Sequence, residues 1–137
     1  MQTAFLIRTN GKLKFIPFDE VLYITAKNNY CQIVITSKKK LLGSVTLGYM
    51  HRKLPENLFC RIHRSYIISL KKIDWLDHNS VTIANEKLPL TKEGFKKITQ
   101  KVLVISPGLD NKLKIEMEGI RAEKYAKKAK RKKGVMI

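Results

Sequence analysis

Short apolar runs separated by turn residues constrain the fold of this chain more than any other feature. The runs at 4–9 and 12–16 flank Asn10-Gly11, the dipeptide most typical of a tight β-hairpin. The runs at 21–27 and 30–36 flank a polar turn, and in the second of them apolar and polar residues alternate. This pattern predicts a mostly β, antiparallel domain.

Two segments instead have helical spacing. From Ser44 to Pro55 apolar residues recur with the period of a helix, and we predict that Ser44 is the N-cap and that Pro55 ends the helix. Thr91 is the predicted N-cap of a second helix, with Phe95 and Ile98 on its apolar face.

The remaining apolar runs are predicted to be strands. Residues 59–70 form one long strand in this prediction. A short meander follows, with strands at 73–78, 80–85 and 87–90 and with turns at His78-Asn79 and Asn85-Glu86. The run at 102–105 is either a last strand or the end of the second helix.

Charge divides the chain into two parts. Lysine and arginine number 28 against 11 acidic residues, which gives a net charge of +17. Residues 106–111 read as a linker, and the basic segment at 112–134 favours helix by propensity. We therefore predict a folded domain at 1–105, and a linker with a basic C-terminal helix or tail at 106–137. Both parts are basic.

Such an excess of positive charge indicates an anionic partner, with nucleic acid ahead of a membrane surface. The tail is open to three interpretations: a non-specific DNA clamp, a membrane-surface helix or a disordered arm. Its apolar stripe is weak and holds no Trp or Phe, so DNA ranks above membrane. The chain shows no signal peptide and no run long enough to span a membrane, so we expect a soluble, cytoplasmic protein.

Catalysis and metal binding have little support in the sequence. No nucleophile motif, phosphate-binding loop or carboxylate pair is visible. Cys60 and His63 have metal-like spacing, but residues three apart on a strand point to opposite faces. Cys31 and Cys60 lie in apolar runs and are expected to be buried free thiols. We expect no cofactor, no metal and no small-molecule substrate.

The run at 59–70 carries charged residues inside an apolar strand. Arg61, His63 and Ser65 share one face, whereas Arg64 breaks the alternation, which predicts a bulge or strand break near Arg64-Ser65. One interpretation is a solvated outer sheet face. The other is that the break aims Arg64 at a ligand while His63 bonds to backbone and, with Ser65, sets the break.

The same run carries a family resemblance. The stretch "FCRIHRSYIISLKKI" resembles the signature of the LytTR-type DNA-binding domain. "IPFDEVLYITAKNNY" is similar to the first core segment of that family, and "LPLTKEGFKKI" is similar to its ending. The resemblance covers roughly residues 5–103. The sequence departs from the family pattern at Thr25, Ser69 and Thr91.

This resemblance implies an elongated, antiparallel multi-sheet β domain with two short helices, which inserts loops from one edge into successive major grooves of double-stranded DNA. It also implies repeated half-sites bound by two copies, hence a homodimer on DNA. Many members of the family carry a receiver domain, so an upstream signalling partner is expected. The chain is then either a stand-alone regulator or one domain of a larger one.

The candidate DNA contacts follow from the resemblance and from side-chain chemistry. Asn28 and Asn29 suit base edges, and Arg64 suits guanine or the minor groove. An ordinary polar turn at 27–30 and a solvated turn at 37–40 remain alternatives. The full predicted set is Lys27, Asn28, Asn29, Tyr30, Lys38, Lys39, Arg61, Arg64, Lys92 and Lys96, with His63 and Ser65 as structural support.

A basic RNA-binding or non-specific nucleic-acid-binding protein is the rival function. The charge and the basic tail suit it, yet the sequence has no aromatic RNP motif and no GXXG loop. Sequence specificity on duplex DNA distinguishes the two functions. The DNA sequence, the direction of regulation and the input signal do not follow from these residues.

Overall fold

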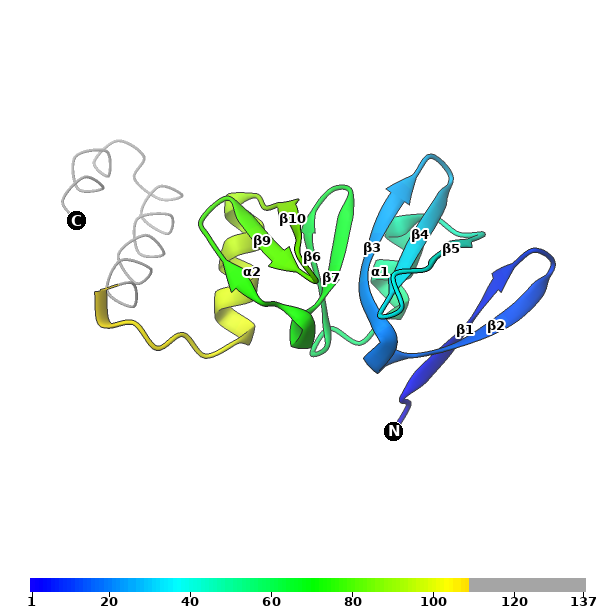
Figure 1. Ribbon diagram of the computed structural model, residues 1–137, viewed down its shortest axis with the longest axis horizontal. Helices are drawn as coiled ribbons and strands as arrows, with labels where there is room; N and C mark the ends of the chain where they lie inside the picture. Colours follow the sequence, from blue (N-terminus) through cyan, green and yellow to red (C-terminus); the bar gives the residue numbers. More distant parts are fainter. Residues whose placement is uncertain (109–137) are drawn as a thin grey trace, which may run out of the picture. The chain divides into compact units, whose positions relative to one another are not determined.

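The computed structural model describes residues 1–108 (Figure 1). A compact unit spans Met1–Val102. The predicted basic helix or tail falls mainly on residues 109–137, which lie outside the described residues. No helix in the described part of the chain has the length and the apolar character needed to cross a membrane.

Three antiparallel sheets make up the domain, so the predicted mostly β fold with two helices is confirmed. The first sheet is the hairpin of β1 (Ala4–Thr9) and β2 (Lys12–Pro17). The central sheet has the order β5-β4-β3-β7-β6, with bounds of Lys40–Gly43, Tyr30–Ile35, Val21–Lys27, Tyr66–Ser69 and Phe59–His63. The third sheet has the order β10-β9-β8, with bounds of Glu86–Pro89, Ser80–Ile83 and Trp75–Leu76. Short 3₁₀ turns span Phe18–Glu20 and Leu70–Lys72.

The first hairpin forms where the sequence places it. Thr9 pairs with Lys12 across the turn, and both turn residues have positive φ, 51° at Asn10 and 76° at Gly11. A two-residue turn of this type matches the right-handed twist of the strands, and asparagine and glycine adopt it at little cost.

The central sheet is buried on both faces. One face packs in a cluster that includes Ile7, Ile16 and Leu47, so β1, β2 and helix α1 (Leu47–Lys53) cover it. The other face packs in a cluster with Val81 and Ile98, so the third sheet and helix α2 (Lys92–Lys101) cover it. Strands buried on both faces are near-continuous apolar runs rather than alternating ones.

This two-sided burial explains one wrong prediction. Residues 59–70 are not one long strand, because β6 ends at His63 and β7 begins at Tyr66. The predicted strand break at Arg64-Ser65 exists, and it is a chain reversal that pairs the two halves antiparallel. A register shift lies just before it, between Arg61 and His63.

Each of the two helices begins after a threonine N-cap. Helix α1 spans Leu47–Lys53, and its N-cap is Thr46, not Ser44: the Thr46 hydroxyl accepts a hydrogen bond from the Tyr49 N–H at 3.2 Å. Helix α2 spans Lys92–Lys101 with Thr91 as the N-cap, as predicted. The run at 102–105 is not a strand, since Val102 is the C-cap of α2.

The third sheet is the predicted meander with one turn displaced. The β9–β10 turn is Ala84-Asn85, not Asn85-Glu86, and both residues have positive φ, 50° and 69°. Cys31 and Cys60 are buried free thiols, as expected from the sequence.

Candidate nucleic-acid interface

Backbone hydrogen bonds tie three segments together at one edge of the domain. The Ser65 carbonyl oxygen, in the β6–β7 turn, accepts a hydrogen bond from the N–H of Ala26 at 3.0 Å. The Ile62 carbonyl oxygen, near the end of β6, accepts from the N–H of Thr91 at 3.3 Å. The β3–β4 turn, the β6–β7 turn and the start of α2 therefore lie side by side, at the upper edge in Figure 1.

The β3–β4 turn presents four exposed side chains to solvent. Lys27 pairs with Tyr30 across the turn, and Asn28 adopts a positive φ of 57°. Asparagine is among the residues that tolerate this backbone conformation best, because its short side chain bonds locally. Tyr30 is 51% exposed although it stands at the start of a core strand. The turn thus offers two amides, an ammonium and a phenol.

The β6–β7 turn is held from within by His63. The Nδ1 atom of the half-buried His63 ring accepts a hydrogen bond from the Ser65 N–H at 3.1 Å. The same ring lies edge-on to the Tyr66 ring, with 5.8 Å between centroids. The backbone bond is of the kind that the sequence leads us to expect of His63. Its importance for DNA binding stays a prediction.

Arg61 holds the same turn through a second hydrogen bond. Its Nη2 atom donates to the Arg64 carbonyl oxygen at 2.7 Å, and its Nε atom is buried with no hydrogen-bond partner among the described residues. Arg61 is half-buried, whereas Arg64 is exposed. The structure thus assigns different positions to two arginines that we expected to contact DNA together. Arg61 lies beneath the turn, and Arg64 is presented by it.

Helix α2 begins close against the backbone of β6. The Thr91 hydroxyl donates to the Ile62 carbonyl oxygen at 3.2 Å and accepts from the Gly94 N–H at 2.9 Å. A Cβ at Gly94 would collide with the carbonyl group of Ile62, so glycine permits this close approach. Lys92 is exposed here, and Lys96 follows one helical turn later and is half-buried.

Lys38 and Lys39 do not belong to this edge. They lie in the turn that follows β4, whereas the Asn28-Asn29 turn precedes it. The six residues of β4 separate the two ends by about 17 Å at a rise of 3.3 Å per residue. Lys38 Nζ also donates to the Ala84 carbonyl oxygen at 3.1 Å, in the β9–β10 turn. The structure therefore does not bring this pair together with the other predicted residues.

The sequence analysis missed Arg52. The Nη1 atoms of Arg52 and Arg61 each lie 4.0 Å from the position that an added Cβ would take at Gly48, in the first turn of α1. Burial lowers the pKa of the neighbouring His51, and the positive charges of Arg61 and Lys97 lower it further. These observations define a positive cluster beside the β6–β7 turn. Sequence spacing cannot reveal it, because it depends on α1 packing next to β6.

No group of three His, Cys, Asp or Glu side chains within residues 1–108 has the arrangement of a metal site. The side chains that the edge presents are amides, hydroxyls and cations, together with the carboxylate of Glu93 in the first turn of α2. Guanidinium, ammonium and amide groups are the donors that proteins use for phosphates and base edges.

Comparisons with known proteins agree with this geometry. The family model of the LytTr DNA-binding domain matches residues 11–103 and includes all three segments of the edge. The "Sensory transduction protein LytR" of Staphylococcus epidermidis is 26% identical over 72 residues, which cover 53% of this chain and 28% of that protein.

A solved structure shares the fold. It is a LytTr DNA-binding domain from Bacillus cereus, with a TM-score of 0.62 and 19% sequence identity. The match covers 76% of this chain and all of that chain. The matched region thus corresponds to one complete domain of that structure and to little more than a quarter of the curated relative.

Proposed function

Because the chain belongs to the LytTr DNA-binding domain family, we propose that it is a bacterial transcription regulator that reads double-stranded DNA with one edge of its β domain. The edge consists of the β3–β4 turn, the β6–β7 turn and the start of α2. In the proposal these segments enter the major groove and contact the flanking phosphates. Residues 1–105 form the DNA-binding domain, and residues 106–137 add non-specific affinity.

The braced β6–β7 turn is the observation that carries the proposal. Two side chains hold its backbone, Arg61 at the Arg64 carbonyl and His63 at the Ser65 N–H. Both bonds go to main-chain atoms, so the Arg64 guanidinium remains exposed. A fixed backbone reduces the conformational entropy that an arginine loses when it binds a base. Arg64 suits bidentate contact with guanine O6 and N7.

The neighbouring segments supply the other contacts. In the proposal Asn28 and Asn29 pair with base edges, adenine above all. Lys27 contacts a phosphate, and Tyr30 stacks or contacts a phosphate. Lys92 is the phosphate contact at the start of α2, with Lys96 behind it. Arg52 joins this set from α1, because its guanidinium and that of Arg61 both lie 4.0 Å from the position that a Cβ on Gly48 would take.

Two copies of the chain would then bind repeated half-sites about one helical turn apart, as a homodimer on DNA. An upstream signalling partner would set when the regulator acts. We further propose that the protein works in the cytoplasm, where the DNA is found.

Selection from a random duplex DNA pool at about 150 mM salt tests the function, because that salt concentration already weakens purely electrostatic binding. We expect enrichment of a motif, with two copies about one turn apart. The variant Arg64→Ala should lose preference at one base position, a loss of about 1–3 kcal/mol. Lys39→Ala, at the opposite end of β4, is the matched control and should enrich the parent motif.

The opposite result is also informative. Binding of the pool without any enriched motif would contradict base reading by this edge. Tighter binding of an RNA pool than of the DNA pool would instead favour the RNA-binding alternative, for which the net charge of +17 is equally suited.

A further inference from the structure

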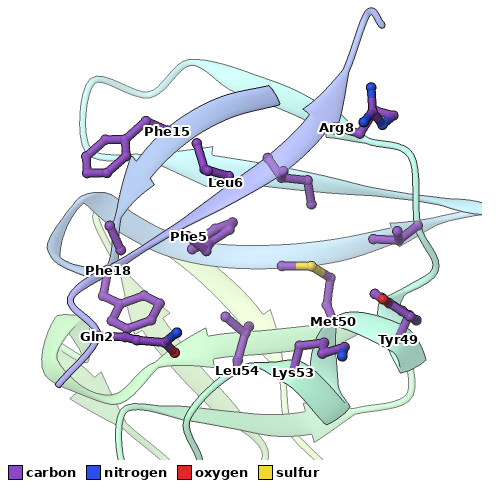
Figure 2. A pocket seen from close by; sticks show the side chains of 13 residues that line it. Gln2, Phe5, Leu6, Arg8, Phe15, Phe18, Tyr49, Met50, Lys53 and Leu54 are labelled. Atoms are coloured by element: carbon purple, nitrogen blue, oxygen red, sulfur yellow. The ribbon is translucent and has the colours of Figure 1, made fainter. Parts of the chain in front are cut away.

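An apolar groove lies between β1 and α1, away from the proposed DNA-binding edge. Its volume is about 610 Å³. Figure 2 shows side chains of β1 facing Met50 and Lys53 of α1, and Leu54 just after it, across the groove. The apolar lining is rich in large side chains, which are Phe5, Leu6, Phe15, Phe18, Met50 and Leu54. Leu6 and Phe15 are 59% and 62% exposed, which is unusual for a pair of large apolar residues directly opposite each other on one hairpin face.

One wall of the groove is an open strand edge. Among residues 1–108, strand β1 pairs only with β2, and the pair Thr9–Lys12 closes a two-residue turn and exchanges hydrogen bonds. Antiparallel strands alternate between hydrogen-bonded and non-hydrogen-bonded pairs. Arg8, Leu6 and Ala4 therefore direct their N–H and C=O groups away from β2.

One contact confirms this direction. The outward carbonyl oxygen of Arg8 accepts a hydrogen bond from the N–H of Ser44 at 3.0 Å. Two residues earlier, the outward N–H and C=O of Leu6 have no protein hydrogen-bond partner within residues 1–108. The edge at Ala4–Leu6 thus combines unpaired backbone groups with a flanking apolar groove. This combination is what a binding site for an added β-strand requires.

Charge determines which kind of strand fits. Arg8 and Lys53 stand at the groove, and none of its lining residues is acidic. Arg52 and Lys53 lie over the Tyr49 ring at 5.6 and 5.5 Å from its centroid, so both cations are held close to the groove. A second copy of this chain, at +17, would bring like charge to like charge. An acidic strand would be attracted.

We propose that this groove binds an extended segment of a partner protein in which apolar and acidic residues alternate. The segment adds to β1 as a third strand of the first sheet, hydrogen-bonded at Ala4–Leu6. Its apolar side chains enter the groove against Met50 and Leu54, and its acidic side chains lie near Arg8 and Lys53. None of the residues that line the site is among the proposed DNA contacts.

A short blocked peptide of alternating valine and glutamate is the probe, and the full chain labelled with ¹⁵N is the target. We expect amide shifts at β1 and α1, and slowed exchange of the Leu6 N–H. A peptide of alternating valine and lysine should not bind. Shifts confined to the 27–30 and 63–65 turns would overturn the proposal, because they would place the peptide on the DNA-binding edge.

A matched proline pair tests the strand edge. Leu6→Pro removes an outward N–H at the groove, and Leu13→Pro removes an outward N–H at the far edge of β2. Neither substitution removes a hydrogen bond between β1 and β2. Leu6→Pro should weaken peptide binding about tenfold, as for the loss of one well-made hydrogen bond, and Leu13→Pro should not. Equal affinities of the two variants would overturn strand addition.

Two further measurements test the charge preference of the groove and the identity of its occupant. Lys53→Glu should weaken binding of the acidic peptide, whereas Lys12→Glu, in the hairpin but outside the groove, should weaken it less. This comparison decides the proposal if Leu6→Pro fails to fold. If the chain self-associates and Leu6→Pro abolishes that self-association, the occupant of the groove is a second copy. This result would overturn the proposal of an acidic partner segment. DNA binding should be the same in the two proline variants, which change no charge, so the test of strand addition is independent of the proposed function.

Discussion

Nη2 of Arg61 donates a hydrogen bond to the carbonyl oxygen of Arg64, 2.7 Å away, across the β6–β7 turn. One arginine thereby holds the backbone of the other. This relationship explains why an apolar hairpin carries two arginines and a histidine. Arg61 and His63 fix the turn, and Arg64 is the side chain that the turn presents.

The hydrogen bond from Arg61 to the Arg64 carbonyl, called here the brace, gives a prediction for Arg61. Arg61→Lys keeps the charge but shortens the reach and loses the planar fork, so the bond to the Arg64 carbonyl should be lost. We expect the free energy of unfolding to fall by about 1.5 kcal/mol, and affinity for the selected duplex to fall as well. Chemical denaturation and fluorescence anisotropy measure the two effects. Arg8→Lys, in the first hairpin and outside the proposed DNA-binding set, is the control, because Arg8 bonds to the Gly11 carbonyl and not to the β6–β7 turn. A duplex affinity unchanged by Arg61→Lys would refute the brace.

His63 should act on binding through the turn and not through contact with DNA. His63→Ala removes the acceptor for the Ser65 N–H, so the turn should loosen and duplex affinity should fall while the fold persists. Circular dichroism and a binding titration together check this prediction. His78→Ala, at an exposed position in the β8–β9 connection, should change neither. Intact folding with intact affinity of His63→Ala would remove His63 from the site.

The contact of α2 with β6 predicts a large difference between two glycines. Gly94→Ala should lower stability by about 1–3 kcal/mol, because the new methyl group meets the Ile62 backbone. Gly48→Ala should be neutral or stabilising by up to about 1 kcal/mol, since its nearest neighbours are 4.0 Å away and alanine favours helix. Thermal unfolding of the two variants tests this ordering. Equal melting temperatures would contradict the tight α2–β6 contact.

His51 predicts a pH dependence of stability. Burial and then Arg61 and Lys97 lower the pKa of His51 below 6.5, with Arg52 adding to the lowering and Glu56 opposing it. The unfolded chain therefore binds a proton at a higher pH than the folded chain does. The contribution of His51 to the free energy of unfolding is fully present above pH 6.5. It is lost as the pH falls through the pKa that His51 has in the folded chain.

The free energies of unfolding of the parent and of His51→Gln should be measured between pH 7.5 and 5.5. The two values should be similar at pH 7.5 and should differ at pH 5.5. The parent should lose more stability than the variant as the pH falls. Parallel curves would show that the positive cluster does not act on His51.

The tail gives the last prediction. Deletion of residues 106–137 removes much of the basic excess, so affinity should fall equally for all duplex sequences and the dependence of affinity on salt should become shallower. Titrations at several salt concentrations, with a specific and a scrambled duplex, separate the two effects. A salt slope that does not change would exclude the tail as an electrostatic clamp.

Local signals in the sequence predicted local structure well. Asn10-Gly11 predicted its hairpin, and Thr91 predicted the start of α2, because both depend on residues within one turn. Ser44 and Thr46 are both good caps, so the first turn of α1 was misplaced by two residues. The reversal at Arg64-Ser65 was hidden because Ile67 and Ile68 are buried on opposite faces of the sheet, which removes the alternation that marks a strand end.

The sequence did not predict which residues distant in the chain lie close together in the fold. Lys38 and Lys39 resembled the other basic candidates, and only the direction of β4 shows that they lie at its other end. Arg61 looked like Arg64 until the fold put one beneath the turn and the other on it. The open edge of β1 likewise follows from strand order, which no local pattern contains.

The two cysteines divide between the two layers of the core. Cys31 belongs to the cluster under β1, β2 and α1, and Cys60 to the cluster under the third sheet and α2. Burial raises the pKa of Cys31 to about 11 and raises that of Cys60, so neither thiol reacts readily while its layer is closed. Each layer of the core therefore contains one thiol whose reaction reports that the layer has opened. The order in which the two thiols become alkylated shows which of the two core layers opens first.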